Sequence, residues 1–191
     1  MWLLVPRGAR VRVCFTIPSV STVKKYRDGR FVGEVSVEKV EDRLYCAVET
    51  LEDVGAYGYV AAAVEGGYDV VNLHVYDPVS PPTVIDTFVV VTHEDGNPPE
   101  AAVVFGPDGQ SQVGVRQVEA GVSVVGPVRL GVGAYLLKLR WADGMELVVP
   151  MFFRYLVPEL VKRAYQLARR NFVLTILLFA GRARLLPTTV P

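Results

Sequence analysis

The sequence predicts a mainly β protein, with one or two antiparallel β-sandwich units followed by a C-terminal α-helix. Valine contributes 37 of the 191 residues and isoleucine only 3, and β-branched side chains fit the pleated, half-buried surface of a sheet. Short apolar runs are separated by Asp-Gly, Gly-Gly and Pro-Pro pairs, which are turn signals. Hydrophobic residues make up 51% of the chain, which is enough for a core of ordinary size.

The runs up to about residue 153 have the length and punctuation of strands. In the run 31–38, Val35 and Val37 alternate with Glu34 and Ser36, as expected for a strand with one solvated face. Short strands at this spacing indicate a sandwich or barrel and not a series of βαβ units. The predicted strands are 9–17, 31–38, 43–50, 56–64, 68–77, 83–93, 101–106, 112–119, 122–129, 134–141 and 145–153.

The segment 76–82 is the best linker candidate, because its three prolines stiffen the chain and exclude a central strand. We therefore predict an N-terminal β domain over 1–80, a β-sandwich over 83–153 and a basic tail over 155–191. A single continuous sandwich that takes in both β regions fits the same length.

Two cysteines, Cys14 and Cys46, raise the question of a disulfide. Alternation places Cys14 with Arg12 on a polar face, whereas Cys46 shares the face of Leu44 and is expected to point into the core. Because the two side chains would point to different environments, we expect two inert thiols, with a disulfide as the alternative.

The composition changes at Tyr155. Apolar residues recur at helical spacing between Leu160 and Ala168, basic residues fill the other side, and Pro158 suits the first helical turn. We predict a basic amphipathic helix within 155–191.

The net charge of zero conceals an acidic body and a basic tail. Residues 1–151 carry 13 basic and 19 acidic side chains, whereas residues 152–191 carry 7 basic and 1 acidic side chain. The basic tail is therefore expected to contact the acidic body, of the same chain or of a neighbour.

Residues 172–180 form an apolar run of nine, far short of the roughly 20 residues that a membrane-spanning helix needs. Four interpretations are open: the buried end of a long helix, which we favour, a buried strand after a turn at Asn171, a subunit contact, or a segment in a membrane interface. The residues predicted for assembly or membrane contact are Arg163, Arg169, Arg170, Phe172, Leu174, Ile176, Leu178 and Phe179.

Two motifs in the second half recur in a known group of β modules. A valine-rich strand leads into Asp95-Gly96-Asn97-Pro98, and Gly133-Ala134-Tyr135 opens a later strand. On these motifs, residues 84–149 resemble an immunoglobulin-like or carboxypeptidase-regulatory (transthyretin-like) β-sandwich repeat, although Ala134 stands where Thr or Lys is frequent. The resemblance implies a sandwich without catalytic residues that serves in adhesion, stalks, assembly or ligand binding.

The sequence lacks the short motifs of common catalytic sites: Gly-x-Ser-x-Gly, the P-loop and His-Glu-x-x-His are all absent. Its two histidines are His74, in a predicted strand, and His93, at a turn. With Asp77 or Asp95 they would form a metal site only if the fold brought them together. We therefore predict a protein that is not an enzyme and has no metal site and no cofactor.

Tyr57 and Tyr59 share one strand face with Ala61 and Ala63. The ordinary interpretation is core packing, and the alternative is a stacking floor for a sugar or peptide, together with the loop 93–99. Exposure of the two rings distinguishes these interpretations.

The expected function is that of a non-catalytic structural or interaction protein, which assembles through its β-sandwich surface and its basic C-terminal helix. The expected partner is a second copy or another protein. Nucleic acid is not expected, because the arginines of the tail are interleaved with Leu and Ala and not with stacking aromatics. The alternatives are a carbohydrate- or peptide-binding module and a peripheral membrane protein anchored by residues 160–184.

The source and cellular location follow less directly from the sequence. Amides, Cys and Met are scarce, which fits a thermophile, so a surface or virion component of a thermophile agrees with the composition. Biased base composition would produce the same pattern. The sequence predicts no signal peptide and no full transmembrane span, and it leaves the location open.

Overall fold

The computed structural model describes residues 2–94, 96–153, 173–179 and 182–188. The described residues form β-strands in four sheets and contain no helix, so the mainly β prediction is confirmed. The predicted helix falls largely on residues 154–172, which lie outside the described residues.

Sheet A has five strands. In spatial order they are β1 (Trp2–Pro6), β8 (Tyr68–Tyr76), β7 (Gly55–Ala62), β3 (Thr22–Arg27) and β4 (Arg30–Glu34). β1 runs parallel to β8, and the other pairs are antiparallel. Both residues of the predicted Asp28-Gly29 turn have positive φ, as a tight hairpin between β3 and β4 requires.

Sheet B also has five strands. Their order is β17 (Arg182–Thr188), β16 (Val173–Phe179), β2 (Arg10–Thr16), β6 (Leu44–Thr50) and β5 (Glu38–Glu41). β16 runs parallel to β2 and antiparallel to β17. This sheet therefore joins the end of the chain to one of its first strands.

The two remaining sheets come from the second half of the chain and are antiparallel throughout. Sheet C is ordered β12 (Val115–Glu119), β13 (Val122–Gly131) and β9 (Val84–Thr92). Sheet D is ordered β11 (Gly109–Val113), β10 (Ala101–Gly106), β14 (Gly133–Arg140) and β15 (Glu146–Phe153).

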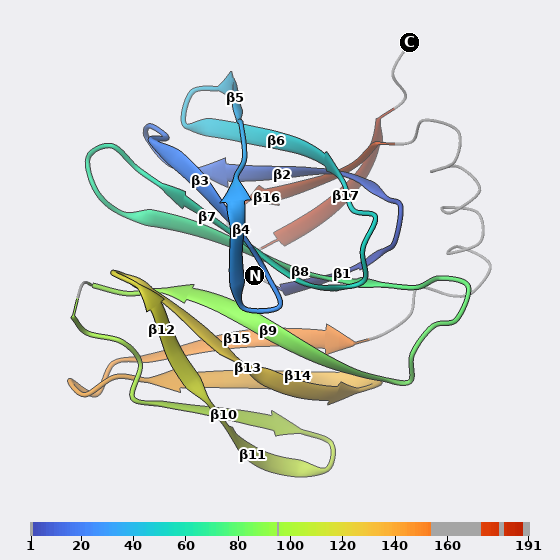
Figure 1. Ribbon diagram of the computed structural model, residues 1–191, viewed down its shortest axis with the longest axis vertical. Helices are drawn as coiled ribbons and strands as arrows, with labels where there is room; N and C mark the ends of the chain where they lie inside the picture. Colours follow the sequence, from blue (N-terminus) through green and yellow to red (C-terminus); the bar gives the residue numbers. More distant parts are fainter. Residues whose placement is uncertain (1, 95, 154–172, 180–181, 189–191) are drawn as a thin grey trace.

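The four sheets stack in the order B, A, C, D, because buried clusters fill the space between each neighbouring pair. Figure 1 shows sheets A and B in the upper half of the molecule and sheets C and D in the lower half. Phe15 and Leu73 are among the residues packed between sheets B and A. Val60 and Val90 pack between sheets A and C. Sheets A and C are therefore covered on both faces.

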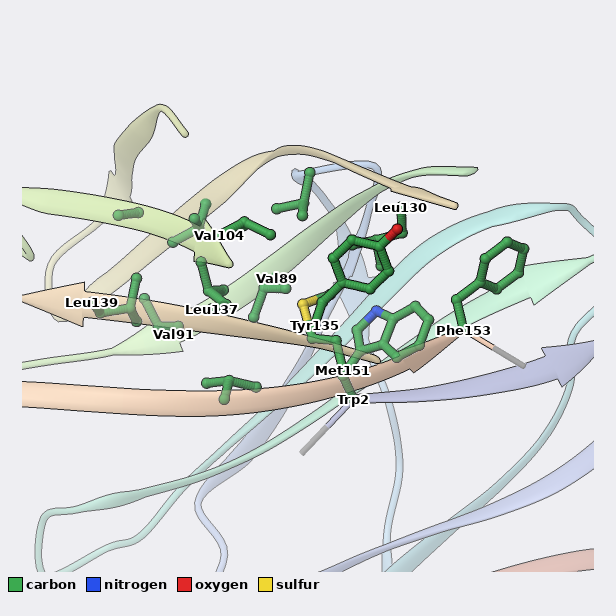
Figure 2. Close-up of a cluster of buried hydrophobic side chains, with 14 of the residues drawn as sticks. Trp2, Val89, Val91, Val104, Leu130, Tyr135, Leu137, Leu139, Met151 and Phe153 are labelled. Carbon is green, nitrogen blue, oxygen red and sulfur yellow. The ribbon is translucent and has the colours of Figure 1, made fainter. Parts of the chain in front are cut away.

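The core between sheets C and D also takes in residues of the first strand, Trp2 and the partly buried Leu4. Trp2, in β1 of sheet A, packs in the same cluster as Met151 and Phe153, and Figure 2 shows its ring beside these side chains. The Trp2 indole Nε1 donates a hydrogen bond to Thr87 Oγ1 at 3.3 Å. The first strand is thus tied to the second half of the chain.

The contact between sheets A and C is built around a buried amide. Asn72, on β8, is 2% exposed; its Nδ2 donates to the Val90 carbonyl oxygen at 2.9 Å, and the Val90 N–H donates to its Oδ1 at 2.8 Å. β9 is the edge strand of sheet C, so this side chain supplies the hydrogen bonds that a neighbouring strand would otherwise make. Gly58, paired with Asn72 in sheet A, leaves the space into which Val90 fits.

Charged groups reinforce the same contact. Glu119, on β12, accepts hydrogen bonds from Tyr26 Oη and from Lys24 Nζ, which both come from β3. Burial alone would raise the pKa of the Glu119 carboxyl, but these two hydrogen bonds outweigh it and lower the pKa below its ordinary value. The carboxylate therefore stays ionised and links sheets A and C.

The prediction of two free thiols is wrong, because Cys14 and Cys46 form a disulfide. β2 and β6 pair antiparallel with Cys14 directly opposite Cys46, so both side chains point to the same face. The prediction took the wrong face of β6 as the core face. The residues of β6 that point inward include Ala47 and Glu49, whereas the apolar Val48 points outward. A partly buried glutamate had disguised the core face.

The apolar run 172–180 was favoured as the end of a helix, but Val173–Phe179 is strand β16. It lies between β2 and β17, and Leu174 and Ile176 pair with Val11 and Val13 in its parallel contact with β2. The strand of that alternative is confirmed, because the fold provides a partner strand on each side of the run, whereas the turn predicted at Asn171 lies outside the described residues.

Most of the strand predictions agree with the structure, but the run 31–38 is a strand only as far as Glu34, so Val35 and Val37 lie between β4 and β5. Four strands of the described part were not predicted: β1, β3, β5 and β17. β1 lacks alternation and ends in a proline, so it did not have the appearance of a strand. β3 carries Lys24 and Lys25 in sequence, and each is paired with a glutamate from another sheet. Such pairing cannot be seen in the sequence of the strand itself.

We expect Gly58→Ala to destabilise the protein, because a Cβ at this position would lie 2.2 Å from Val90 Cγ2. Overpacking of this kind costs about 1–3 kcal/mol of unfolding free energy, measurable by urea denaturation. Gly114→Ala is the matched control, since the nearest atom to its added Cβ would lie at 3.6 Å. Equal stability of the two variants would contradict the close packing of β7 against β9.

Removal of the disulfide by Cys14→Ser together with Cys46→Ser should also lower stability. The bond closes a loop with a sequence separation of 32 residues, for which the loss of chain entropy predicts about 3–4 kcal/mol. Thermal unfolding of the double variant and of the wild type, with and without reductant, measures the effect. A double variant as stable as the oxidised wild type would show that the disulfide does not constrain the unfolded chain.

Candidate binding face

The outer face of sheet D lies at the end of the stack of sheets. Along β14 and β15, alternate residues such as Leu137, Leu139 and Met151 are buried against sheet C. The residues between them therefore point away from the core. The composition of this outward set makes the face a candidate for binding.

One end of the face is apolar. Leu136 and Phe152 are 48% and 62% exposed, and Val148 is 49% exposed. The register places Pro150 directly beside Leu136 and Ala134 directly beside Phe152. We call the set Leu136, Val148, Pro150 and Phe152 the apolar patch. A contiguous exposed apolar surface of this kind commonly marks a site of interaction.

A groove of about 450 Å³ lies along β10 on the same face. Its floor is formed by Ala101, Val103 and Phe105, and its walls by longer side chains from the flanking strands. Ala101 and Val103 are shorter than the side chains on either side of them, which produces the hollow. The wall residues are Gln110, Gln112, Lys138, Arg140 and Glu146.

The walls of the groove carry polar groups of several kinds. Lys138 Nζ lies 2.8 Å from Glu146 Oε2. Among the described residues, none forms a hydrogen bond or ion pair with the side chains of Arg140, Gln110 or Gln112. The groove therefore combines an apolar floor with donors and acceptors that are free to meet a ligand.

The other candidate floor, Tyr57 and Tyr59, is closed. Their exposed fractions are 4% and 0%, and they pack with Ala61 and Ala63 in the core between sheets A and B. The shared face was predicted correctly. The rings are not open for stacking, so the Tyr57–Tyr59 ligand site is not supported.

The hydroxyl groups of these tyrosines are satisfied within the protein. Tyr59 Oη donates to Glu49, which also accepts a hydrogen bond from Lys25 Nζ at 2.9 Å, and Tyr57 Oη donates to the Asp53 carbonyl oxygen at 3.1 Å. Burial, followed by the hydrogen bond with Glu49, raises the pKa of the Tyr59 hydroxyl. Its proton therefore stays on the ring oxygen.

The two histidines are buried in separate places. His74 Nδ1 lies 3.1 Å from Thr87 Oγ1, and His93 Nε2 lies 2.9 Å from Ser123 Oγ. Within the described ranges, no group of three or more His, Cys, Asp and Glu side chains could hold a metal ion. Each imidazole instead satisfies a buried hydroxyl group.

The residues predicted for assembly or membrane contact fall into two groups. Four of them, Arg163, Arg169, Arg170 and Phe172, lie outside the described residues. The other four lie in β16, which is hydrogen-bonded on both sides within sheet B: Leu174, Ile176, Leu178 and Phe179. No helix in the described part of the chain is long and apolar enough to cross a membrane.

Comparison with known proteins gives no family for this chain. No protein-family model matches it, and no curated protein matches its sequence. The sheet architecture is compatible with a β-sandwich, but no family match supports the resemblance of residues 84–149 to an immunoglobulin-like repeat.

The sequence carries one signal for the outer face of sheet D, in strand β15. Residues 147–153 are apolar at every position, so both faces of this strand are apolar. A strand of this kind is normally covered on both sides. Here only one side is covered, as the exposure of Val148 and Phe152 shows.

The pKa of His74 predicts a pH dependence of stability. Burial disfavours the imidazolium and, against a weaker opposing effect of Asp28, lowers the pKa to about 4 from the ordinary 6.5. As the pH drops, the unfolded chain therefore binds this proton before the folded protein does. The free energy of unfolding falls by on the order of 3 kcal/mol between about pH 6.5 and about pH 4.

His74→Gln keeps a hydrogen-bonding group near Thr87 but does not titrate. We expect urea denaturation at several pH values to show a shallower loss of stability for this variant than for the wild type. Identical pH profiles for the two proteins would contradict the buried neutral imidazole.

Proposed function

We propose that this protein is a non-catalytic interaction protein that self-associates through the apolar patch of sheet D. The observation that carries the proposal is the exposure of Leu136, Val148 and Phe152 together on one sheet face. Isolated exposed apolar residues are common on protein surfaces, whereas contiguous ones are uncommon in monomers.

The character of the patch favours a second copy as the partner. In an isologous dimer, the same surface lies on both sides of the interface, so it must be complementary to itself. The apolar patch contains no charged residue, and its contact with a copy of itself involves no repulsion. Arg140 and Glu146 lie toward the other end of the same face, and Lys138, which is paired with Val148 at the border of the patch, has its charge met by Glu146.

The opposite charges of the body and the tail support a further electrostatic contribution to assembly. Residues 1–151 are acidic overall and residues 152–191 are basic, so the tail of one copy can attract the body of another. Such attraction weakens with salt, whereas contact through the apolar patch does not.

Phe152→Glu tests the proposal, because it places a charge within the apolar patch at its most exposed side chain. We expect the wild type to run above the mass of the 21.0 kDa monomer in light scattering at high protein concentration, and the variant to shift toward the monomer. Burial of an unpaired carboxylate should weaken the dimer at least tenfold.

Val64→Glu is the matched control, since Val64 is 68% exposed and lies in the turn between β7 and β8. It should leave the mass unchanged. A wild type that is monomeric at every concentration, or equal dissociation by both variants, would exclude self-association through sheet D.

A further inference from the structure

We infer that the groove along β10 is a binding site for a short acidic oligosaccharide, with a sugar carboxylate held by Arg140. The groove adjoins the apolar patch on the same face, because Phe105 is paired with Leu136, but the residues that line the groove are not those of the patch. Three features of the groove lead to this ligand: its backbone groups are already hydrogen-bonded, its walls are polar and cationic, and its floor is apolar.

The backbone of the groove favours recognition by side chains alone. β10 is an interior strand that pairs with β11 on one side and β14 on the other. A peptide that binds by adding a strand needs the free backbone groups of a sheet edge. Over β10 those groups are already paired, so a ligand here must present its own donors and acceptors to side chains.

The walls fit a ligand rich in hydroxyl groups. Gln110 and Gln112 stand on one side of the floor, and Lys138 and Arg140 stand on the other. A side-chain amide offers both donors and an acceptor, and a guanidinium offers several donors in one plane. Sugar hydroxyls, which donate and accept, can bridge such groups on both sides of a narrow groove.

The charge of the walls indicates an acidic ligand. Two cations and one carboxylate line the groove, and the carboxylate, Glu146, is already paired with Lys138. The Arg140 guanidinium has no charged partner among the described residues. A guanidinium binds a carboxylate through two parallel hydrogen bonds. Arg140 is therefore the residue that would bind the carboxylate of a uronic sugar.

The floor supplies the apolar contact that sugar rings require. Phe105 is 39% exposed at one end of the groove, and Val103 lies next to it along the outward face. The C–H face of a pyranose ring can pack on such an aromatic side chain, as apolar ligand surface generally does. The four steps from Ala101 to Phe105 span about 13 Å, so the ligand is short.

Isothermal titration calorimetry of the full-length protein with a short oligogalacturonide tests the inference. We expect saturable binding that weakens with salt, and weaker binding of a neutral galacto-oligosaccharide of the same length. Arg140→Ala should reduce affinity for the acidic sugar about tenfold and leave the neutral sugar almost unaffected. Phe105→Ala should weaken both sugars.

Two controls separate this site from general effects. Arg30→Ala removes an exposed arginine on β4 and should leave the affinity unchanged. Phe152 does not line the groove, so Phe152→Ala, which shortens the patch without adding a negative charge, should bind the sugar normally even if it self-associates less, and failure of one proposal is distinguishable from failure of the other. Thermal unfolding of each variant establishes that it is folded.

Three results would overturn the inference. The first is the absence of binding of any oligosaccharide to the wild type at millimolar concentration. The second is equal loss of affinity in Arg140→Ala and Arg30→Ala, which would indicate charge attraction without a site. The third is tighter binding of an oligoglutamate peptide than of the oligogalacturonide, which would assign the groove to acidic peptides.

Discussion

The structure depends on one buried amide and the space beside it. Asn72 pairs with both backbone groups of Val90, and Gly58 allows β9 to approach β7 closely enough for that pairing. A buried polar side chain is tolerated only when its hydrogen bonds are made, so this contact sets the position of sheet C on sheet A. At Val90 it also satisfies the backbone groups that the edge strand β9 would otherwise leave unpaired.

The consequences for binding follow from this stacking. Because sheets A and C are covered on both faces, the outward faces of the stack belong to sheets B and D. On sheet B, the outward side of β2 presents Arg10, Arg12 and Thr16, which suit contact with water. The outward side of sheet D carries the apolar patch and the groove. Sheet D is therefore the face on which an interaction is most readily explained.

Partly buried charges between the sheets decide several features that look irregular in the sequence. Lys25 and Tyr59 both reach Glu49, which thereby occupies the core side of β6 without an unpaired charge. Lys24 and Tyr26 satisfy Glu119 in the same way at the next interface. Each carboxylate comes from a different sheet than its partners. These networks specify which strands face one another, and breaking them would leave an uncompensated charge in the interior.

The sequence by itself determined most of the strands, the Asp28-Gly29 turn and the shared face of Tyr57 and Tyr59, because alternation and turn chemistry are local properties. Tertiary structure decided the disulfide, the strand at Val173–Phe179 and the exposure of sheet D. Alternation shows which residues share a face, but a second sheet decides whether that face is covered. Pairing between β2 and β6 likewise joins segments whose mutual register no single strand encodes.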